Sequence, residues 1–130
     1  MMILVYTDGA AKGDPGTSGA GIFIKAGDNH FTYSIPLGIL SNHEAEFHAV
    51  LQALKICRKE FPESILSFRS DSKIVVDTIE KDYTKNTIYR SLLEQIKEEA
   101  KHFPHFFIKW IPEKQNANAD NLARQALYLE

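Results

Sequence analysis

Cysteine is almost absent from this sequence, and neither sign of charge is in large excess. Cys57 is the single cysteine in 130 residues, which excludes an intrachain disulfide and a cysteine-based zinc cluster and indicates a reducing compartment. A lone cysteine is most often a small buried apolar residue. Fifteen Lys and Arg residues oppose seventeen Asp and Glu residues, giving a net charge of −2. Any contact with a polyanion must therefore come from a local patch of the surface.

Long hydrophobic runs and cofactor motifs are missing as well. The apolar segment at residues 1–6 is too short for a membrane span or a signal sequence and has no basic flank, so we expect a cytoplasmic protein without membrane contact. Gly16, Gly19 and Gly21 have reversed dinucleotide-binding spacing and lead into a strand, and no phosphate-loop lysine motif exists. The five histidines lack zinc-ligand spacing. We therefore expect no small-molecule organic cofactor.

The residues that are present suit one compact domain over residues 1–130, with 44% hydrophobic residues and neither repeats nor a linker. Hydrophobic periodicity predicts strands at about 3–7, 20–26, 30–37, 65–70 and 105–110, and helices at about 43–60, 72–81, 87–101 and 118–129. Asn42 is the predicted N-cap of the first helix. A long glycine-rich turn is expected between the first two strands, and Asp8 is expected to end the first.

This order of elements predicts a mixed α/β (α+β) fold. A meander of three antiparallel strands is followed by a crossover that brings the fourth strand parallel to the first. If these two strands are neighbours, the connections diverge between them, and ligands of open α/β sheets gather at the carboxyl ends of strands at such a point. Asp8 and Asp71 lie at those two strand ends.

Two helix acids point toward the same place. Glu46 is in helical phase with the apolar residues at 50, 53 and 57, and Asp120 is in phase with those at 123 and 127. Taken singly, each of the four acids has a structural explanation, as a turn residue, a helix cap or a solvated helix acid. Together they can converge, and converging carboxylates repel one another unless a cation compensates. Oxygen donors without Cys or clustered His suit Mg²⁺ or Mn²⁺, and two such ions favour phosphodiester hydrolysis.

The motifs around these acids resemble type 1 ribonuclease H over nearly the whole chain. The matching segments are Thr7-Asp8-Gly9-Ala10, Gly13-Asp14-Pro15-Gly16, Ser41-Asn42-His43-Glu44-Ala45-Glu46, Ser70-Asp71-Ser72 and Asn118-Ala119-Asp120-Asn121-Leu122-Ala123. The resemblance implies a five-stranded sheet in the order 3-2-1-4-5. It also implies an endonuclease that cuts the RNA strand of RNA–DNA hybrids with two Mg²⁺ or Mn²⁺ ions and leaves 5′-phosphate and 3′-hydroxyl ends. The catalytic metal ligands would be Asp8, Glu46, Asp71 and Asp120.

Contacts to the hybrid are expected on both sides of these acids. RNA is recognised by its 2′-hydroxyls in a shallow minor groove, which favours close-fitting backbone and small polar groups. By resemblance, Ser41 corresponds to a threonine that contacts a DNA-strand phosphate. The full set of expected substrate-binding residues is Lys12, Gly13, Asp14, Ser41, Asn42, His43, Ser72, Lys73 and Lys114. For Ser72 and Lys73, a plain helix N-terminus with a solvated lysine is an equally good interpretation.

Three departures from the family pattern predict modest affinity for the hybrid and a shallow salt dependence. Asp14 and His43 stand where relatives commonly have Asn. The segment 111–117 has no His or Arg, for which Lys114 would be a poor substitute, and Glu113 opposes an anionic substrate. Residues 79–86 are too few to form a basic protrusion. A weakly active or noncatalytic hybrid-binding module is therefore the alternative, with a small-substrate phosphatase as a third hypothesis. We expect a monomer.

Overall fold

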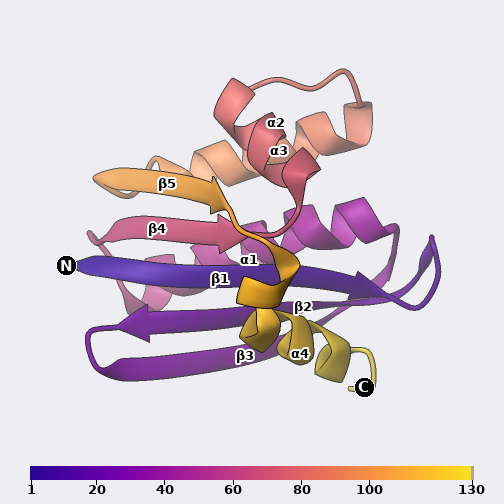
Figure 1. Cartoon of the computed structure of the whole chain (residues 1–130). Helices are drawn as coiled ribbons and strands as arrows, with labels where there is room; N and C mark the ends of the chain where they lie inside the picture. The colour runs from indigo at the N-terminus through magenta and orange to yellow at the C-terminus, as the bar shows by residue number, and fades with distance from the viewer. Residues whose placement is uncertain (130) are drawn as a thin grey trace.

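The computed structural model describes residues 1–129. Within that range the elements follow one another as β1 (Met2–Ala11), β2 (Gly16–Ala26), β3 (Asn29–Leu40), α1 (Asn42–Glu60), β4 (Ile65–Ser70), α2 (Lys73–Lys81), α3 (Thr87–Ala100), β5 (His105–Trp110), the short 3-10 helix η1 (Glu113–Gln115) and α4 (Ala117–Ala126) (Figure 1). The types and sequence order of the predicted strands and helices are confirmed.

The strands form one sheet in the order β3-β2-β1-β4-β5, which confirms the predicted mixed sheet. β1 pairs antiparallel with β2 and parallel with β4, so the connections diverge between β1 and β4. In this parallel pair Thr7 lies opposite Ser70. Asp8 and Asp71 are the next residues along the two neighbouring segments, and both therefore lie at the point where the topology switches.

The first two strands are longer than the sequence predicted. β1 continues through Asp8 to Ala11, so Asp8 is not its last residue, and β2 begins at Gly16. The expected long turn is a short hairpin connection, in which the Lys12 N–H donates to the Thr17 carbonyl over 2.8 Å. Ladder pairing, for example of Ala11 with Ser18, extends into a glycine-rich segment whose composition indicated a loop. Strand pairing therefore overrides local propensity here.

The cap of α1 is a further correction, because Ser41 and not Asn42 is the N-cap. The Ser41 hydroxyl accepts a hydrogen bond from the Glu44 N–H (3.2 Å), and the Glu44 carboxylate accepts one from the Ser41 N–H (3.1 Å). This capping box satisfies two backbone donors at the start of the helix. It leaves Asn42 exposed in the first turn. At the other end of the chain, α4 is shorter than the predicted helix and ends at Ala126.

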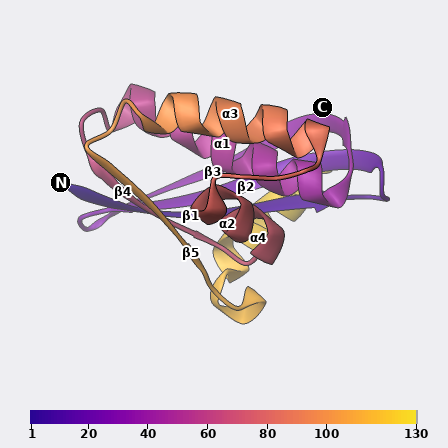
Figure 2. The same ribbon diagram turned by 90° about the horizontal axis from the view of Figure 1, so that it is seen from above.

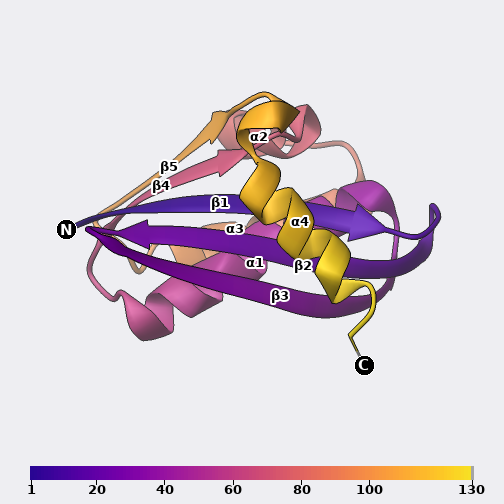
Figure 3. The same ribbon diagram turned by 60° about the horizontal axis from the view of Figure 1, so that its bottom comes forward.

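Helices lie on both faces of the sheet. α1 and α3 lie side by side on one face (Figure 2), and α4 crosses the other face obliquely over β1, β2 and β3 (Figure 3). The core lies between the sheet and α1 and α3, and its largest fully buried side chains include Ile3, Ile22, Phe47, Leu54 and Phe68. The expectation that Cys57 is a buried apolar residue is confirmed, and burial raises the pKa of its thiol to about 12. Within residues 1–129, no helix is long and apolar enough to span a membrane.

Glycines allow α1 and α4 to lie directly against the sheet backbone. A Cβ at Gly9 would lie 2.4 Å from the Ala45 carbonyl carbon in α1, and one at Gly21 would lie 2.0 Å from the Ala119 carbonyl oxygen in α4. The Ser34 hydroxyl also donates a hydrogen bond of 2.8 Å to the Leu122 carbonyl of α4. Ala45 and Ala119 directly precede Glu46 and Asp120, so the close approach fixes where these two acids lie.

We expect Gly21→Ala to lower the free energy of unfolding by about 2–3 kcal/mol, because the added methyl group meets helix backbone that cannot move without separating α4 from β2. Urea denaturation measures the loss, and amide hydrogen exchange locates it. The control is Gly38→Ala, where a Cβ meets nothing within 4 Å and only the positive φ of 80° opposes the change. In Gly21→Ala, but not in Gly38→Ala, we expect the amide hydrogens of α4 to exchange faster than those of α1. The same exchange pattern in both variants would contradict this packing argument.

Candidate active site

A polar hollow of about 290 Å³ opens at the switch point of the sheet. Five segments contribute to its lining, which consists of Asp8 and Gly9 of β1, Glu46 of α1, Asp71 after β4, Glu113 of η1 and Asp120 of α4. The structure thus brings together the four acids that the sequence singled out, and it adds Glu113 to them. Carboxylates separated by up to 112 positions in the chain share one small space.

The two strand acids are held by backbone and amide groups. The Gly9 N–H donates to the Asp8 carboxylate over 3.0 Å, and the Trp110 indole N–H donates to the Asp71 carbonyl over 3.2 Å. The buried Asn116 side chain donates to the Thr7 carbonyl over 2.9 Å and also hydrogen-bonds the Asp71 carboxylate. Asn116 therefore ties the start of α4 to β1 beside both acids.

The two helix acids are held from the other sides of the hollow. Glu46 lies in the second turn of α1, and its carboxylate hydrogen-bonds the Ser72 side chain. Asp120 lies in the first turn of α4 and forms an ion pair of 3.2 Å with Arg124, one turn further along the helix. Each helix acid therefore has one polar partner, while the space between the acids holds no cationic side chain among the residues lining the hollow.

Among the acids of the hollow, Asp8 has the most strongly shifted pKa. Burial is the largest cause that raises the pKa of its carboxyl from 3.8 to about 9, and the charges of Asp71 and Glu46 add to it. Burial also raises the pKa values of Glu46 and Asp71, although hydrogen bonds from Ser72 and Asn116 respectively oppose these shifts. Without a cation in the hollow, Asp8 therefore keeps its proton at neutral pH, because the Asp120–Arg124 ion pair does not offset the four converging carboxylates.

This set of donors fits a hard divalent cation by its chemistry. Carboxylate oxygens dominate the lining, and such ligands suit Mg²⁺ or Mn²⁺. Among residues 1–129, no three His, Cys, Asp or Glu side chains stand close enough together to hold an ion in the conformations described. Two buried polar atoms in neighbouring residues, Thr7 Oγ1 and Asn116 Oδ1, lack hydrogen-bond partners in the same range, although neither residue lines the hollow. Side-chain rotation within the hollow would be required for binding.

The expected substrate-binding residues of the β1–β2 connection and of the start of α1 lie in two segments that one hydrogen bond joins. Asp14, in the β1–β2 connection, accepts a bond of 3.0 Å from the Asn42 N–H and so joins the hairpin to the start of α1. Gly13 has a φ of 131°, and the Lys12 ammonium lies 3.7 Å from the centre of the Tyr128 ring. His43 is exposed and packs its ring edge against Tyr89. Ser41 is occupied by the capping box.

The remaining predicted contact residues differ in accessibility. Ser72 is 7% exposed and acts as the N-cap of α2, with its hydroxyl accepting from the Val75 N–H over 3.4 Å. Lys73 is exposed, with its ammonium 5.6 Å from the Trp110 ring, and Lys114 is exposed in η1. For Ser72 the structure shows the capping role, and contact with substrate stays a prediction for all three.

Asn116 is the residue of this site that sequence reasoning missed. It is 1% exposed and joins β1, Asp71 and the start of α4. An asparagine just before a helix is ordinarily interpreted as an N-cap, but here its side chain forms no capping bond. The available signal was its position four residues before Asp120, which sequence alone does not distinguish from a cap.

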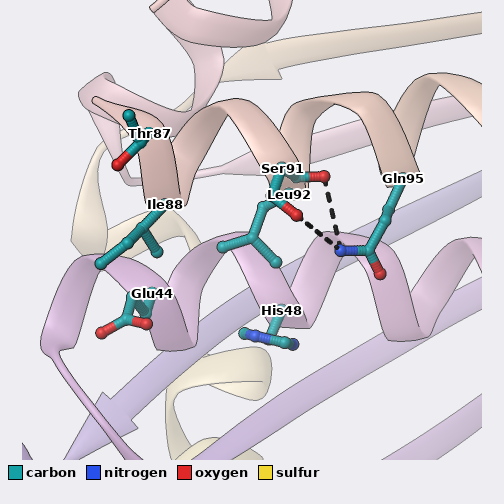
Figure 4. Close-up of a pocket in the computed structure, with 7 residues that line it drawn as sticks. All are labelled: Glu44, His48, Thr87, Ile88, Ser91, Leu92 and Gln95. Atoms are coloured by element: carbon teal, nitrogen blue, oxygen red, sulfur yellow. Dashed lines mark hydrogen bonds between the residues drawn. The ribbon is translucent and has the colours of Figure 1, made fainter. Parts of the chain in front are cut away.

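A larger groove of about 420 Å³ lies elsewhere, between α1 and α3 (Figure 4). Glu44, His48, Ile88 and Leu92 line it, and the Gln95 amide donates two bonds of 3.4 Å to Ser91. Burial is the largest cause that lowers the pKa of His48. None of the four converging acids lines this groove, so the polar hollow remains the candidate active site.

The sequence of this chain is similar to a family model and to several known proteins. A family model described as "Reverse transcriptase-like" matches residues 6–126. "Putative hydrolase EbsB" of Enterococcus faecalis is 48% identical over 128 residues, which cover 97% of this chain and 94% of that protein. Ribonuclease HI of Halobacterium salinarum is 28% identical, over 94% of this chain but 62% of the relative.

Solved structures agree with the family match. The crystal structure of RNase H1 from Halobacterium salinarum superposes with a TM-score of 0.92 at 26% identity, covering 98% of both chains. LC11-RNase H1, crystallised in complex with an RNA/DNA hybrid, gives a TM-score of 0.89 at 27% identity over 96% of both chains. The chain therefore belongs to the reverse transcriptase-like family and is a hydrolase of the ribonuclease H type.

Proposed function

We propose that this protein cleaves the RNA strand of RNA–DNA hybrids and leaves 5′-phosphate and 3′-hydroxyl ends. The observation that carries the proposal is the convergence of Asp8, Glu46, Asp71 and Asp120 on one hollow that no cationic side chain lines. Similarity to a ribonuclease H1 that was crystallised with a hybrid supports the choice of substrate. A monomer in the cytoplasm remains our expectation.

In this proposal Asp8, Glu46, Asp71 and Asp120 hold two Mg²⁺ or Mn²⁺ ions, which supply an activated water and neutralise charge on the phosphodiester. The protein contributes the placement of these acids. Gly9 and Asn116 restrain the two strand acids through hydrogen bonds, and the glycine contacts of α1 and α4 restrain the two helix acids. Glu113 adds a further negative charge at the rim, which opposes an anionic substrate.

Recognition of the hybrid is assigned to the joined hairpin and helix start beside the acids. The Asp14–Asn42 hydrogen bond holds backbone and small polar groups of residues 12–14 and 41–43 next to each other. Such groups can approach 2′-hydroxyls and backbone phosphates in a shallow groove. On the opposite side, Lys73 and Lys114 are exposed cations that can reach phosphates. With so few cations, affinity is modest and depends weakly on salt.

A noncatalytic hybrid-binding module is the second candidate. Two observations favour it: Glu113 crowds the hollow with a further carboxylate, and residues 111–117 carry no His or Arg to assist turnover. This module would bind hybrids without cutting them in any divalent metal. The cleavage assay described next separates the two candidates.

We expect Asp8→Asn and Asp71→Asn each to reduce cleavage of a labelled RNA strand in a hybrid by about a thousandfold or more, because each removes a charged ligand on which metal-assisted hydrolysis depends. Asp77→Asn, an exposed aspartate of α2, is the matched control and should cut normally. Gel analysis of the fragments also identifies their end groups. Hybrid binding by the unaltered protein without cleavage in Mg²⁺ or Mn²⁺ would establish the noncatalytic module instead.

Metal-free stability should depend on Asp8. Its pKa is raised in the folded state, so the folded protein binds more protons than the unfolded chain, and stability falls as pH rises from about 4 toward 9. Each unit of that shift corresponds to about 1.4 kcal/mol. We expect Asp8→Asn to flatten the pH dependence of thermal unfolding measured in a chelator, and to raise the melting temperature at pH 7. Added Mg²⁺ should stabilise the unaltered protein more than the variant; identical profiles would argue against a raised pKa at Asp8.

The Asp14 carboxylate should weaken substrate binding. In Asp14→Asn the amide oxygen can still accept the bond from the Asn42 N–H, while a negative charge beside the phosphates is removed. We expect KM for the hybrid to fall about two- to fivefold at low salt, consistent with roughly 1 kcal/mol for one charge near the surface. Asp28→Asn in the β2–β3 turn is the control. An unchanged KM in both variants would place the hybrid away from this hairpin.

A further inference from the structure

The part of the sheet that α4 leaves uncovered carries an unusual combination of side chains. α4 lies over the sheet near the carboxyl end of β1, and no helix lies over the opposite part of that face in Figure 3. In the strand registers, Tyr6 lies opposite Phe23 on β2 and opposite Arg69 on β4. Leu4 lies opposite Lys25, and Arg69 lies opposite Lys109. Because opposite residues share a face, these side chains all point away from α1 and α3.

We call this surface the open-face patch and define it as Tyr6, Phe23, Lys25, Arg69, Phe107 and Lys109. The same face also carries His30, Thr32, Ser67 and His105, and its one acid among the described strand residues is Asp8 of the hollow, two residues beyond Tyr6. Phe107 is 54% exposed and Lys109 is also exposed, whereas Tyr6, Lys25 and Arg69 are half-buried and Phe23 is buried beneath them. On a chain with a net charge of −2, three cations without an acid between them form a local positive surface.

The cations of the patch lie near aromatic rings and not on carboxylates. The Lys25 ammonium lies 5.7 Å from the Tyr6 ring and 5.9 Å from the Phe23 ring, and the Arg69 guanidinium lies 5.6 Å from the Tyr6 ring. Within the described part of the chain, Lys25, Arg69 and Lys109 form no ion pair. One guanidinium nitrogen of Arg69 is buried without a hydrogen-bond partner. No carboxylate therefore neutralises these three charges, and Lys109 is the most accessible of them.

A small polar hollow adjoins the patch. It has a volume of about 110 Å³ and is lined by Tyr6, Phe23 and Lys25 together with the amides of Gln115, Asn116 and Asn118. Asn116 is 1% exposed, and its Oδ1 atom has no hydrogen-bond partner among residues 1–129. Side-chain amides with free donors and acceptors can bond to the edges of bases. Asn116 thus contributes to the wall of this hollow a side chain whose acceptor has no partner within the described residues.

We propose that the open-face patch binds single-stranded nucleic acid, with a base stacked on the exposed Phe107 ring and phosphates on Lys25, Arg69 and Lys109. Unpaired bases on aromatic side chains beside cations are the general mode of single-strand recognition on a sheet surface. Two residues beyond Tyr6 and Arg69 lie Asp8, still within β1, and Asp71, directly after β4. The patch is thus continuous with the acid hollow, and a strand leaving that hollow can run onto it. An acidic protein segment would use the cations but not the rings.

The test measures binding of fluorescein-labelled oligo(dT) and oligo(U) of about 12 nucleotides, within the usual site size, by fluorescence anisotropy in a chelator. The chelator removes divalent ions, and oligo(dT) is DNA that is not a hydrolysis substrate. The result is therefore independent of the proposed cleavage. We expect Lys25→Gln/Arg69→Gln/Lys109→Gln to weaken binding about tenfold or more, with a reduced salt slope. Lys55→Gln/Lys59→Gln/Lys81→Gln, exposed lysines on α1 and α2, remove equal charge and should have little effect.

Phe107→Ala separates nucleic acid from an acidic segment. Loss of a stacking ring should weaken oligonucleotide binding about fivefold or more while leaving poly-glutamate binding unchanged. Amide NMR shifts on adding oligo(dT) to the unaltered protein should map to residues 4–6, 23–25, 67–69 and 107–109, which tests the site without relying on variants that could misfold. No oligonucleotide binding, equal losses in the lysine control, shifts only elsewhere, or oligonucleotide binding unchanged in Phe107→Ala would each overturn the proposal.

Discussion

Direct contact of two helices with bare strand backbone determines where the functional groups of this protein lie. α1 meets β1 at Gly9 and α4 meets β2 at Gly21, at separations that leave no room for a side chain. Most helices pack on sheets through intervening side chains, whose rotamers allow some variation in position. Here backbone rests on backbone, so the residues that directly follow the contacts, Glu46 and Asp120, are placed with little freedom. Such placement suits a site that must hold several charged groups within one small hollow.

Bringing these charged groups together destabilises the folded protein electrostatically. Burial and mutual repulsion raise the pKa of Asp8 to about 9 and raise the pKa values of Glu46 and Asp71 as well, so the folded state holds protons that the unfolded chain would release. The surrounding polar groups limit this destabilisation only in part. Asn116 supports Asp71, and Ser72 supports Glu46, but each of these residues also has a structural task in capping or joining elements. Function and stability are therefore opposed at the hollow, and a divalent cation would reconcile them.

The net charge is close to zero, but acidic and basic side chains are concentrated in separate regions of the surface. Carboxylates gather at one point of the sheet, while Lys25, Arg69 and Lys109 occupy the uncovered part of the face next to it. β1 contributes to both regions, through Asp8 and through Tyr6. Asp8 and Tyr6 lie on the same face of β1, so this strand joins the anionic hollow to the cationic and aromatic surface. A nucleic-acid strand that passed over both would meet charges of opposite sign within a few residues, which orients a strand more than it increases affinity.

Sequence alone determined the element types, the sheet order implied by the ribonuclease H resemblance, and the four acids, because hydrophobic periodicity and motif spacing are local properties. It misjudged the ends of β1 and α4 and the cap of α1, where ladder pairing and the Ser41–Glu44 capping box outweigh the propensities of glycine and asparagine. Only the tertiary structure decided that Asn116 joins β1 to α4, that Glu113 enters the hollow, and that Arg69 and Lys25 flank Tyr6. These relations depend on how segments far apart in the chain pack, and packing distance is not encoded in any local pattern.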